Sequence, residues 1–287
     1  MKRLLSILYR LLLRVVPENR AGDRFIALMG FLWAHRRLPG DGLAFNDVLY
    51  RLKTSDEITD PLRVFVSDKE FLKVYVKAII GEQFNVPTIA ILRTLSDAKG
   101  YVFPSDCCIK PTHLSGQVIL RRGSEAIDFD KISGWFRSSQ YRATREANYR
   151  TLRPKVIVEP LVFDSDNVSD YKIFCYGGKR PGLIQVDLDR HTAHTRKYFD
   201  ADWNEQGFSL IYPLSGRRVE KPRNLDRMIE VARLLSEAFS LARIDLYSDG
   251  EQCLVGEITN CPENVWGRFI PRSAETIASR MIFGARE

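Results

Sequence analysis

Residues 242–258 read Ala242-Arg243-Ile244-Asp245-Leu246-Tyr247-Ser248-Asp249-Gly250-Glu251-Gln252-Cys253-Leu254-Val255-Gly256-Glu257-Ile258. Two apolar runs flank a Ser-Asp-Gly-Glu turn, and this pattern predicts a β-hairpin. Asp245 and Glu257 lie inside the apolar runs. An acid inside such a strand must be paired or bound to a metal if it is buried. We therefore predict that these two carboxylates are ligands of a hard cation, of the kind that magnesium provides beside phosphates.

The register of this hairpin decides whether the two acids can act together. Side chains alternate between the faces of a strand, so Asp245 and Glu257 share a face only if the loop holds an odd number of residues or a bulge shifts the register. We expect the odd loop, centred on Gly250, with Lys110 approaching the same cleft.

Further strands and helices set the fold class. Short β-rich runs predict strands at 88–92, 107–110, 117–120, 155–159, 171–176 and 183–187. A capping-box pattern at Ser67-Asp68-Lys69-Glu70 opens a predicted helix that ends at Gly81, and apolar spacing predicts another over 225–239. Strands joined by hairpins, with helices between the groups, favour an α+β chain with largely antiparallel sheets. No G-x-G-x-x-G motif opens a helix, which argues against a doubly wound dinucleotide fold.

The charge and the cysteines narrow the function classes. The 287 residues carry a formal net charge of +7, and residues 1–40 account for +6 of it. The rest of the chain is close to neutral and lacks the basic face of a nucleic-acid-binding protein, so we expect no nucleic-acid partner. The five cysteines show no C-x-x-C spacing and indicate reduced thiols in a cytoplasmic protein.

Residues 1–16 form a leucine-rich basic segment. Arg10 and Arg14 interrupt its apolar run well short of the length that a membrane-spanning helix needs. Two interpretations stay open. The segment is either an interfacial helix on the anionic inner leaflet, which would make the protein peripheral at the plasma membrane, or a helix packed on the domain.

Several polar residues at strand ends suit a nucleotide. Lys110 ends a predicted strand, and a loop of small residues follows it as far as Gly116. An ammonium group beside loop amides suits phosphate oxygens, although a solvated lysine before a turn is the simpler alternative. Glu159 and Asp170 also stand at strand ends. Their carboxylates suit an adenine amine or ribose hydroxyls, or serve only solubility.

A cationic cluster follows the strand at 183–187. It contains Arg190, His191, His194 and Arg196. Charge-assisted bonds to a phosphoryl group or a substrate carboxylate are one use for it, and a solvated hairpin edge is the other.

Taken in order, these residues resemble the ATP-grasp superfamily, and specifically its TupA-like branch, which is associated with teichuronopeptide and other surface-polysaccharide biosynthesis. The similarity runs from about Leu43 to Pro262. The segments that carry it are Ala44-Phe45-Asn46 with Leu52-Lys53, Ser67-Asp68-Lys69 with Lys73, Cys108 to Gly116, Val156 to Glu159, Asp170 to Lys179, Ile184 to Thr192, Arg243 to Tyr247, and Gly256 to Thr259.

The resemblance implies an ATP-grasp fold, in which two α+β lobes clasp a nucleotide, here with an N-terminal helical extension. It divides the chain into a basic extension at 1–40 and a catalytic unit at 41–287. Within that unit we expect an N-terminal part at about 41–110, a small nucleotide-clasping lobe at 111–165 and a C-terminal lobe at 166–287.

The resemblance also assigns roles to single residues. It implies the ATP-phosphate lysines Lys73 and Lys110, a flexible phosphate loop from His113 through Ser115 to Gly116, the adenine-side acid Glu159, the ribose acid Asp170, and the magnesium ligands Asp245 and Glu257. We count His113, Arg190 and Arg196 as catalytic candidates.

The implied activity is that of an ATP- and magnesium-dependent carboxylate-amine ligase. Such an enzyme phosphorylates a carboxylate, here of a uronic acid or amino acid in a polysaccharide or sugar-acid acceptor, and an amine captures the acylphosphate. Two departures bear on this. Thr259 stands where the superfamily usually has Asn, and Cys261 to Trp266 replaces a glycine-rich ending. They leave the second metal and the acceptor pocket open, together with a kinase-like reaction.

Two rival functions remain. Asp187-Leu188-Asp189 is a D-x-D that would suit a metal-dependent glycosyltransferase, which needs a parallel βαβ nucleotide-binding half upstream. The other rival is a non-catalytic membrane-surface scaffold in the same pathway, which the N-terminal charge and the altered ending favour.

Overall fold

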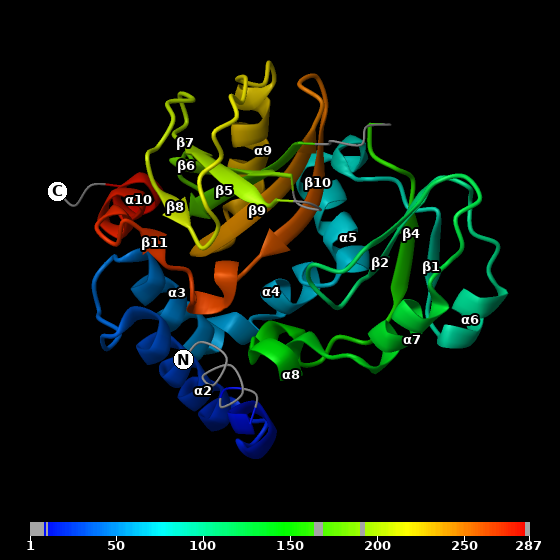
Figure 1. Ribbon diagram of the computed structural model, residues 1–287, viewed down its shortest axis with the longest axis horizontal. Coiled ribbons are helices and arrows are strands. Elements are labelled where there is room, and N and C mark those ends of the chain that lie inside the picture. The colour runs from blue at the N-terminus through cyan, green and yellow to red at the C-terminus, as the bar shows by residue number, and fades with distance from the viewer. Residues whose placement is uncertain (1–8, 10, 164–168, 190–192, 285–287) are drawn as a thin grey trace.

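Antiparallel pairing organises both of the larger sheets in the computed structural model, which describes residues 9, 11–163, 169–189 and 193–284 (Figure 1). The larger sheet has the order β10-β9-β5-β6-β7, and the smaller has the order β1-β4-β2-β3. The strands of the larger sheet are β5 (Ser169–Tyr176), β6 (Leu183–Leu188), β7 (Thr195–Phe199), β9 (Leu241–Ser248) and β10 (Cys253–Thr259). Those of the smaller are β1 (Ala90–Leu92), β2 (Cys107–Pro111), β3 (Ile119–Arg121) and β4 (Val156–Glu159). A short pair joins β8 (Ser209–Leu210) to β11 (Phe269–Ile270).

Helices surround these sheets in the described part of the chain. They are α2 (Arg20–His35), α3 (Phe45–Thr54), α4 (Pro61–Val66), α5 (Lys69–Ile80), α6 (Leu95–Gly100), α7 (Phe129–Arg137), α8 (Gln140–Thr144), α9 (Leu225–Ser236) and α10 (Ala274–Phe283), with short 3-10 turns between them. The predicted α+β class with largely antiparallel sheets is confirmed, and so are the eight predicted strands and the two predicted helices.

The start of α5 differs from its prediction. Asp68, not Ser67, is the N-cap, and its carboxylate accepts a hydrogen bond from the Glu70 amide at 2.9 Å. The Ser67 hydroxyl instead donates to the Arg63 carbonyl at 2.6 Å. The capping box predicted here was therefore wrong, although an acidic N-cap serves the same orphan amides.

Side-chain alternation gives the five-stranded sheet two unlike faces. Tyr171, Ile173 and Ile244 point to one face, where they pack with α9 and α5 in the main hydrophobic core. Asp170 and Lys172 alternate with them and point to the other face. The sheet therefore buries a hydrophobic face and presents a polar one.

The four-stranded sheet has its own core with α6 and α7, which includes Ile109, Val158 and Trp135. It takes strands from both sides of the predicted boundary at residue 110. In Figure 1 this sheet lies beside the β10 edge of the five-stranded sheet, beyond α5.

The N-terminal helices share a core with the C-terminal part of the chain. Phe31 of α2 and Phe45 of α3 pack with Phe269 of β11 in one hydrophobic cluster. In Figure 1, α3 lies beside α10 and β11, and α2 lies against α3. Arg145 is fully buried and donates hydrogen bonds to the carbonyls of Leu13, Val16 and Pro17. These contacts attach the described end of the basic segment to the body of the protein.

The predicted interfacial segment is described only in part, because residues 1–8 and 10 lie outside the described residues. The Tyr9 ring contacts Trp266 edge-on at 4.7 Å, whereas Leu11 and Val15 are exposed. Among the described helices none combines the length and the apolar character needed to cross a bilayer.

Candidate active site

A cavity of about 920 Å³ is lined by residues of both larger sheets. Its volume lies within the range of small-molecule sites. Of the predicted site residues, those that line it are Lys110, Ser115, Gly116, Asp170, Arg196, Asp245 and Glu257. Lys73, His113 and Glu159 do not line it, and Arg190 lies outside the described residues.

The centre of the polar sheet face is a buried lysine surrounded by acids. Lys172 Nζ lies 2.6 Å from Asp170 Oδ2, 3.1 Å from Asp245 Oδ2 and 3.7 Å from Asp187 Oδ2. Burial opposes the charge of Lys172, but Asp170 and Asp245 outweigh it and raise the pKa of this lysine. Lys172 was not predicted as a site residue from the sequence. The available signal was a lysine two residues after Asp170 in an otherwise apolar strand, which places both side chains on one face.

A bulge brings the two predicted metal ligands together. Ser248 pairs with Cys253, so the hairpin loop holds the four residues 249–252 and the odd loop predicted from the sequence was wrong. The register then shifts between Val255 and Glu257, so that Glu257 stands directly opposite Asp245. Directly opposed residues of an antiparallel pair share a face. The bulge thus achieves what the odd loop was expected to do.

Gly256 is the residue that the bulge adds. A Cβ atom at this position would lie 2.9 Å from the Tyr247 ring, which is too close for an ordinary contact. Glycine therefore allows the bulge and the Tyr247 ring to occupy the same edge of the hairpin.

Asp245 is held as a charged group. Arg243 Nε lies 2.7 Å from Asp245 Oδ1, in addition to the Lys172 contact. Burial would raise the pKa of Asp245, but Arg243 and Lys172 lower it below the usual range. Magnesium in nucleotide sites commonly uses one or two carboxylates, with phosphates and waters as its other ligands. Both Asp245 oxygens already accept hydrogen bonds from Arg243 and Lys172, so Asp245 would share its charge with an ion, whereas Glu257 opposite it has the donor type that such an ion uses. The described residues contain no group of three His, Cys, Asp or Glu side chains suited to hold a metal without such help.

Glu159 joins the two predicted phosphate lysines. Its Oε2 lies 2.7 Å from Lys110 Nζ, and its Oε1 lies 2.6 Å from Lys73 Nζ. Burial opposes the charges of Glu159 and Lys110, but their neighbours outweigh it. Lys110 and Lys73 lower the pKa of Glu159, and Tyr247 and Glu159 raise the pKa of Lys110. The carboxylate therefore stays ionised and holds two ammonium groups beside the cavity, of which only Lys110 reaches its wall.

The loop after Lys110 has a buried start and an exposed end. His113 is 3% exposed, and its Nε2 lies 3.1 Å from the Trp135 carbonyl oxygen. Burial lowers the pKa of His113, which favours the neutral ring. Ser115 and Gly116 are exposed at the cavity, and Gly116 has a φ of 71°. The structure thus brings the end of this loop to the cavity but not His113.

Arg196 reaches the cavity from β7 with two carboxylate partners. Its Nε lies 2.9 Å from Asp187 Oδ1, and its NH1 lies 2.6 Å from Glu263 Oε1. The guanidinium carbon lies 4.4 Å from the centre of the Tyr212 ring.

The two acids of the D-x-D sequence have different partners. Asp189 has a left-handed backbone and pairs with Arg217 at 2.7 Å, whereas Asp187 pairs with Arg196. All named strand pairs in the described residues are antiparallel. The parallel half that the glycosyltransferase interpretation requires is thus missing from the described sheets.

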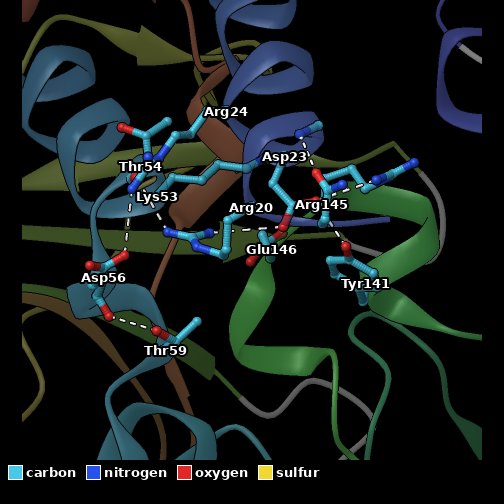
Figure 2. Close-up of polar contacts among 12 residues, drawn as sticks. Arg20, Asp23, Arg24, Lys53, Thr54, Asp56, Thr59, Tyr141, Arg145 and Glu146 are labelled. Atoms are coloured by element: carbon cyan, nitrogen blue, oxygen red, sulfur yellow. Dashed lines mark hydrogen bonds and ion pairs between the residues drawn. The ribbon is translucent and has the colours of Figure 1, made fainter. Parts of the chain in front are cut away.

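A buried acid in the cavity wall was also missed from the sequence. Glu146 follows α8, as Figure 2 shows. It lines the cavity and is 6% exposed. Burial raises its pKa to about 7, an effect that Lys53 opposes and Glu257 supports. Lys53 is itself buried, and its Nζ donates to the Thr144 carbonyl at 2.8 Å. No local pattern marks Glu146, because its neighbours come from distant parts of the chain.

Solved structures of several ligases resemble this chain at low sequence identity. The D-alanine-D-alanine ligase from Bacillus anthracis complexed with ATP is 14% identical, with 69% of this chain and 55% of that chain covered and a TM-score of 0.38. The D-alanine-D-alanine ligase from Helicobacter pylori is 14% identical, with 79% and 64% covered and a TM-score of 0.40. The L-amino acid ligase from Bacillus licheniformis is 13% identical, with 83% and 54% covered and a TM-score of 0.43. The chain thus spans between 54% and 64% of the length of these three ligases.

The family assignment rests on a different comparison, because TM-scores below 0.5 carry no weight for it. No curated protein matches the chain. The TupA-like ATPgrasp family matches residues 48–282, which is most of the chain. The fold is therefore that of the ATP-grasp proteins. The chain belongs to the TupA-like ATP-grasp family, as its sequence motifs predicted.

Proposed function

We propose that this protein is an ATP- and magnesium-dependent carboxylate-amine ligase. The observation that carries the proposal is the convergence of Lys110, Asp245 and Glu257 on one cavity, although they come from two different sheets. A phosphate-binding cation and a pair of magnesium-type carboxylates are the groups that a nucleotide triphosphate requires. Membership of an ATP-grasp family supports the same nucleotide.

The phosphate end of the cavity would lie at Lys110. Its ammonium group is held in place by Glu159, and Ser115 and Gly116 line the same cavity. We propose that Lys110 contacts the ATP phosphates and that Lys73 acts beside it through Glu159. Asp170 remains the proposed ribose ligand. The Glu159 carboxylate already accepts hydrogen bonds from two lysines. It therefore has less capacity left to bind the adenine amine than we expected from the sequence.

Asp245 and Glu257 would hold magnesium at the other side of the phosphates. The ion would neutralise phosphate charge when it is bound with the nucleotide. Lys172 and Arg243 keep Asp245 ionised and fix its direction. Glu257 has no ion pair within 4 Å among the described contacts, which suits a ligand that is completed by the incoming ion.

The proposed chemistry has two steps. A carboxylate oxygen of the acceptor attacks the terminal phosphorus of ATP, and ADP leaves with the electrons of the broken P–O bond. The nitrogen of an amine then attacks the carbonyl carbon of the acylphosphate, inorganic phosphate leaves, and the amine loses its protons to the phosphate and to solvent. Arg196 lies on the cavity wall where a guanidinium group could orient the acceptor carboxylate.

We further propose that the acceptor is a uronic acid or amino acid of a cell-surface polysaccharide, as the resemblance implied. The division of the chain into an extension, an N-terminal part, a small lobe and a C-terminal lobe belongs to the same proposal. Exposed Leu11 and Val15 in a basic segment support attachment to the inner leaflet.

No observation in the described residues favours the glycosyltransferase over this ligase.

Trapping with hydroxylamine tests the proposal without knowledge of the amine. The protein is incubated with magnesium, hydroxylamine and either ATP, a UDP-sugar or no nucleotide, against a panel of uronic acids and amino acids. We expect ADP and a hydroxamate to form together, only with ATP and only with particular carboxylates. ADP release that no carboxylate stimulates, or release of UDP with a UDP-sugar, would refute the ligase.

A further inference from the structure

Three consecutive residues after β10 have left-handed backbones, and the first two of them line the cavity. Glu263, Asn264 and Val265 have φ values of 56°, 51° and 68°, in the segment where a glycine-rich ending was expected. Glycine adopts this conformation freely, whereas a β-branched residue such as Val265 is a rare occupant of it. The backbone here thus has a conformation suited to glycine, although none of the three residues is glycine.

Contacts from three other elements hold this turn. The Asn264 side chain accepts a hydrogen bond from Lys53 of α3. His35 of α2 bonds to the Val265 carbonyl through Nε2 at 2.9 Å. Glu263 pairs with Arg196 of β7. Glu263 and Asn264 both line the cavity, so the anchored turn forms part of its wall.

The contact of Glu263 with Arg196 lies at the cavity wall and uses an N–H donor of the guanidinium group. A carboxylate binds a guanidinium group most strongly through two parallel N–H donors. Arg196 NH1 already donates to the Leu210 carbonyl at 3.0 Å and contacts Glu263 at 2.6 Å, while Nε contacts Asp187.

The two acids on Arg196 differ in how firmly they are enclosed. The Asp187 side chain is 1% exposed and the Glu263 side chain is 16% exposed. Both acids line the cavity, but Glu263 is the more exposed of the two and therefore the one that a ligand can more readily displace.

We propose that Glu263 is an internal competitor for the acceptor carboxylate: it occupies Arg196 in the empty site, and a carboxylate substrate must displace it. This inference rests on the proposed ligase function, which supplies the carboxylate. It makes Glu263 a specificity-determining residue. Weakly held carboxylates are excluded from Arg196, and only an acceptor with further contacts to the cavity takes the place of Glu263.

The test compares Glu263→Gln with a matched control. Glu205→Gln makes the same change in another ion pair of the same strand, because Glu205 lies 2.6 Å from Lys197 Nζ and does not line the cavity. Glu263→Gly is a second variant that suits the left-handed backbone and should fold. Phenylglyoxal, which modifies arginine, is applied to each protein, and mass spectrometry follows the peptide that contains Arg196. The second readout is the KM for the carboxylate that best stimulates ADP release, with the KM for ATP as reference.

Phenylglyoxal should modify Arg196 several times faster in both Glu263 variants than in the wild type. The rate in the Glu205 control should equal that of the wild type. The KM for the carboxylate should fall on the order of tenfold, with an unchanged KM for ATP. Unchanged labelling, or a rise in the KM for the carboxylate, would overturn the inference. If the Glu263 variants are labelled faster but no carboxylate stimulates ADP release by the wild type, the ligase function is refuted. The role of Glu263 as a competitor of a carboxylate substrate then falls with it.

Discussion

Replacement of Glu146 by Gln measures what the buried acid in the cavity wall costs the folded protein. Burial raises the pKa of Glu146 from 4.5 to about 7. Below pH 4.5 the carboxyl group is protonated in both the folded and the unfolded state. Between pH 4.5 and 7 the folded state binds more protons, so the free energy of unfolding falls as the pH rises. At about 1.4 kcal/mol per pKa unit, this shift corresponds to a loss of about 3 kcal/mol across that range.

Urea denaturation of the wild type and of Glu146→Gln at pH 4.5, 6, 7 and 8 provides the assay. Groups that titrate in both proteins cancel in the difference. Whatever its starting value, the stability of the Gln variant relative to the wild type should rise by about 3 kcal/mol from pH 4.5 to 7 and stay level above it. A difference that does not change with pH would refute the burial of an acid at this position.

Three further predictions follow from other contacts. Lys110→Ala should weaken ATP binding, measured by calorimetry, on the order of tenfold or more, whereas Lys179→Ala, in a hairpin turn away from the cavity, should have little effect. Equal small effects of the two substitutions would contradict the phosphate role of Lys110. Lys172→Met should lower the free energy of unfolding by about 3–5 kcal/mol, because it leaves buried acids without their cation. A decrease of less than about 1 kcal/mol in urea denaturation would contradict the buried pairing. Deletion of residues 1–16 should abolish cosedimentation with anionic vesicles and leave ATP binding intact. The melting temperature should fall, because Arg145 loses carbonyl partners. Retained vesicle binding would contradict the interfacial role, and an insoluble product would show that the segment serves the core.

Strands and hairpins were predictable because their signal is local. Apolar alternation marks β9 and β10, and an Asp-Gly turn separates them. The strand β7 was missed, because the side chains of Arg196 and Lys197 are buried in it and break the apolar pattern. Ion pairs satisfy these two cations, and only the fold supplies their acidic partners.

The candidate site was predictable in its carboxylates and lysines but not in their pairing. Asp245 and Glu257 were recognised as acids inside apolar strands, yet the bulge at Gly256 depends on how the chain packs around Tyr247. Lys53 and Glu146 are 93 positions apart in the sequence, so no local pattern relates them. Such long-range contacts decide which charges are neutralised and which face a ligand.

Transfer of oxygen from the acceptor to phosphate is the most direct measure of the proposed reaction. The protein is supplied with ATP, magnesium, hydroxylamine and the stimulating carboxylate labelled with ¹⁸O in both oxygens, and the released phosphate is analysed by mass spectrometry. If the carboxylate attacks the terminal phosphorus, each phosphate released with a hydroxamate carries one ¹⁸O atom. Phosphate that contains no ¹⁸O while ADP accumulates would show that water, not the acceptor, takes the phosphoryl group, and would contradict the ligase.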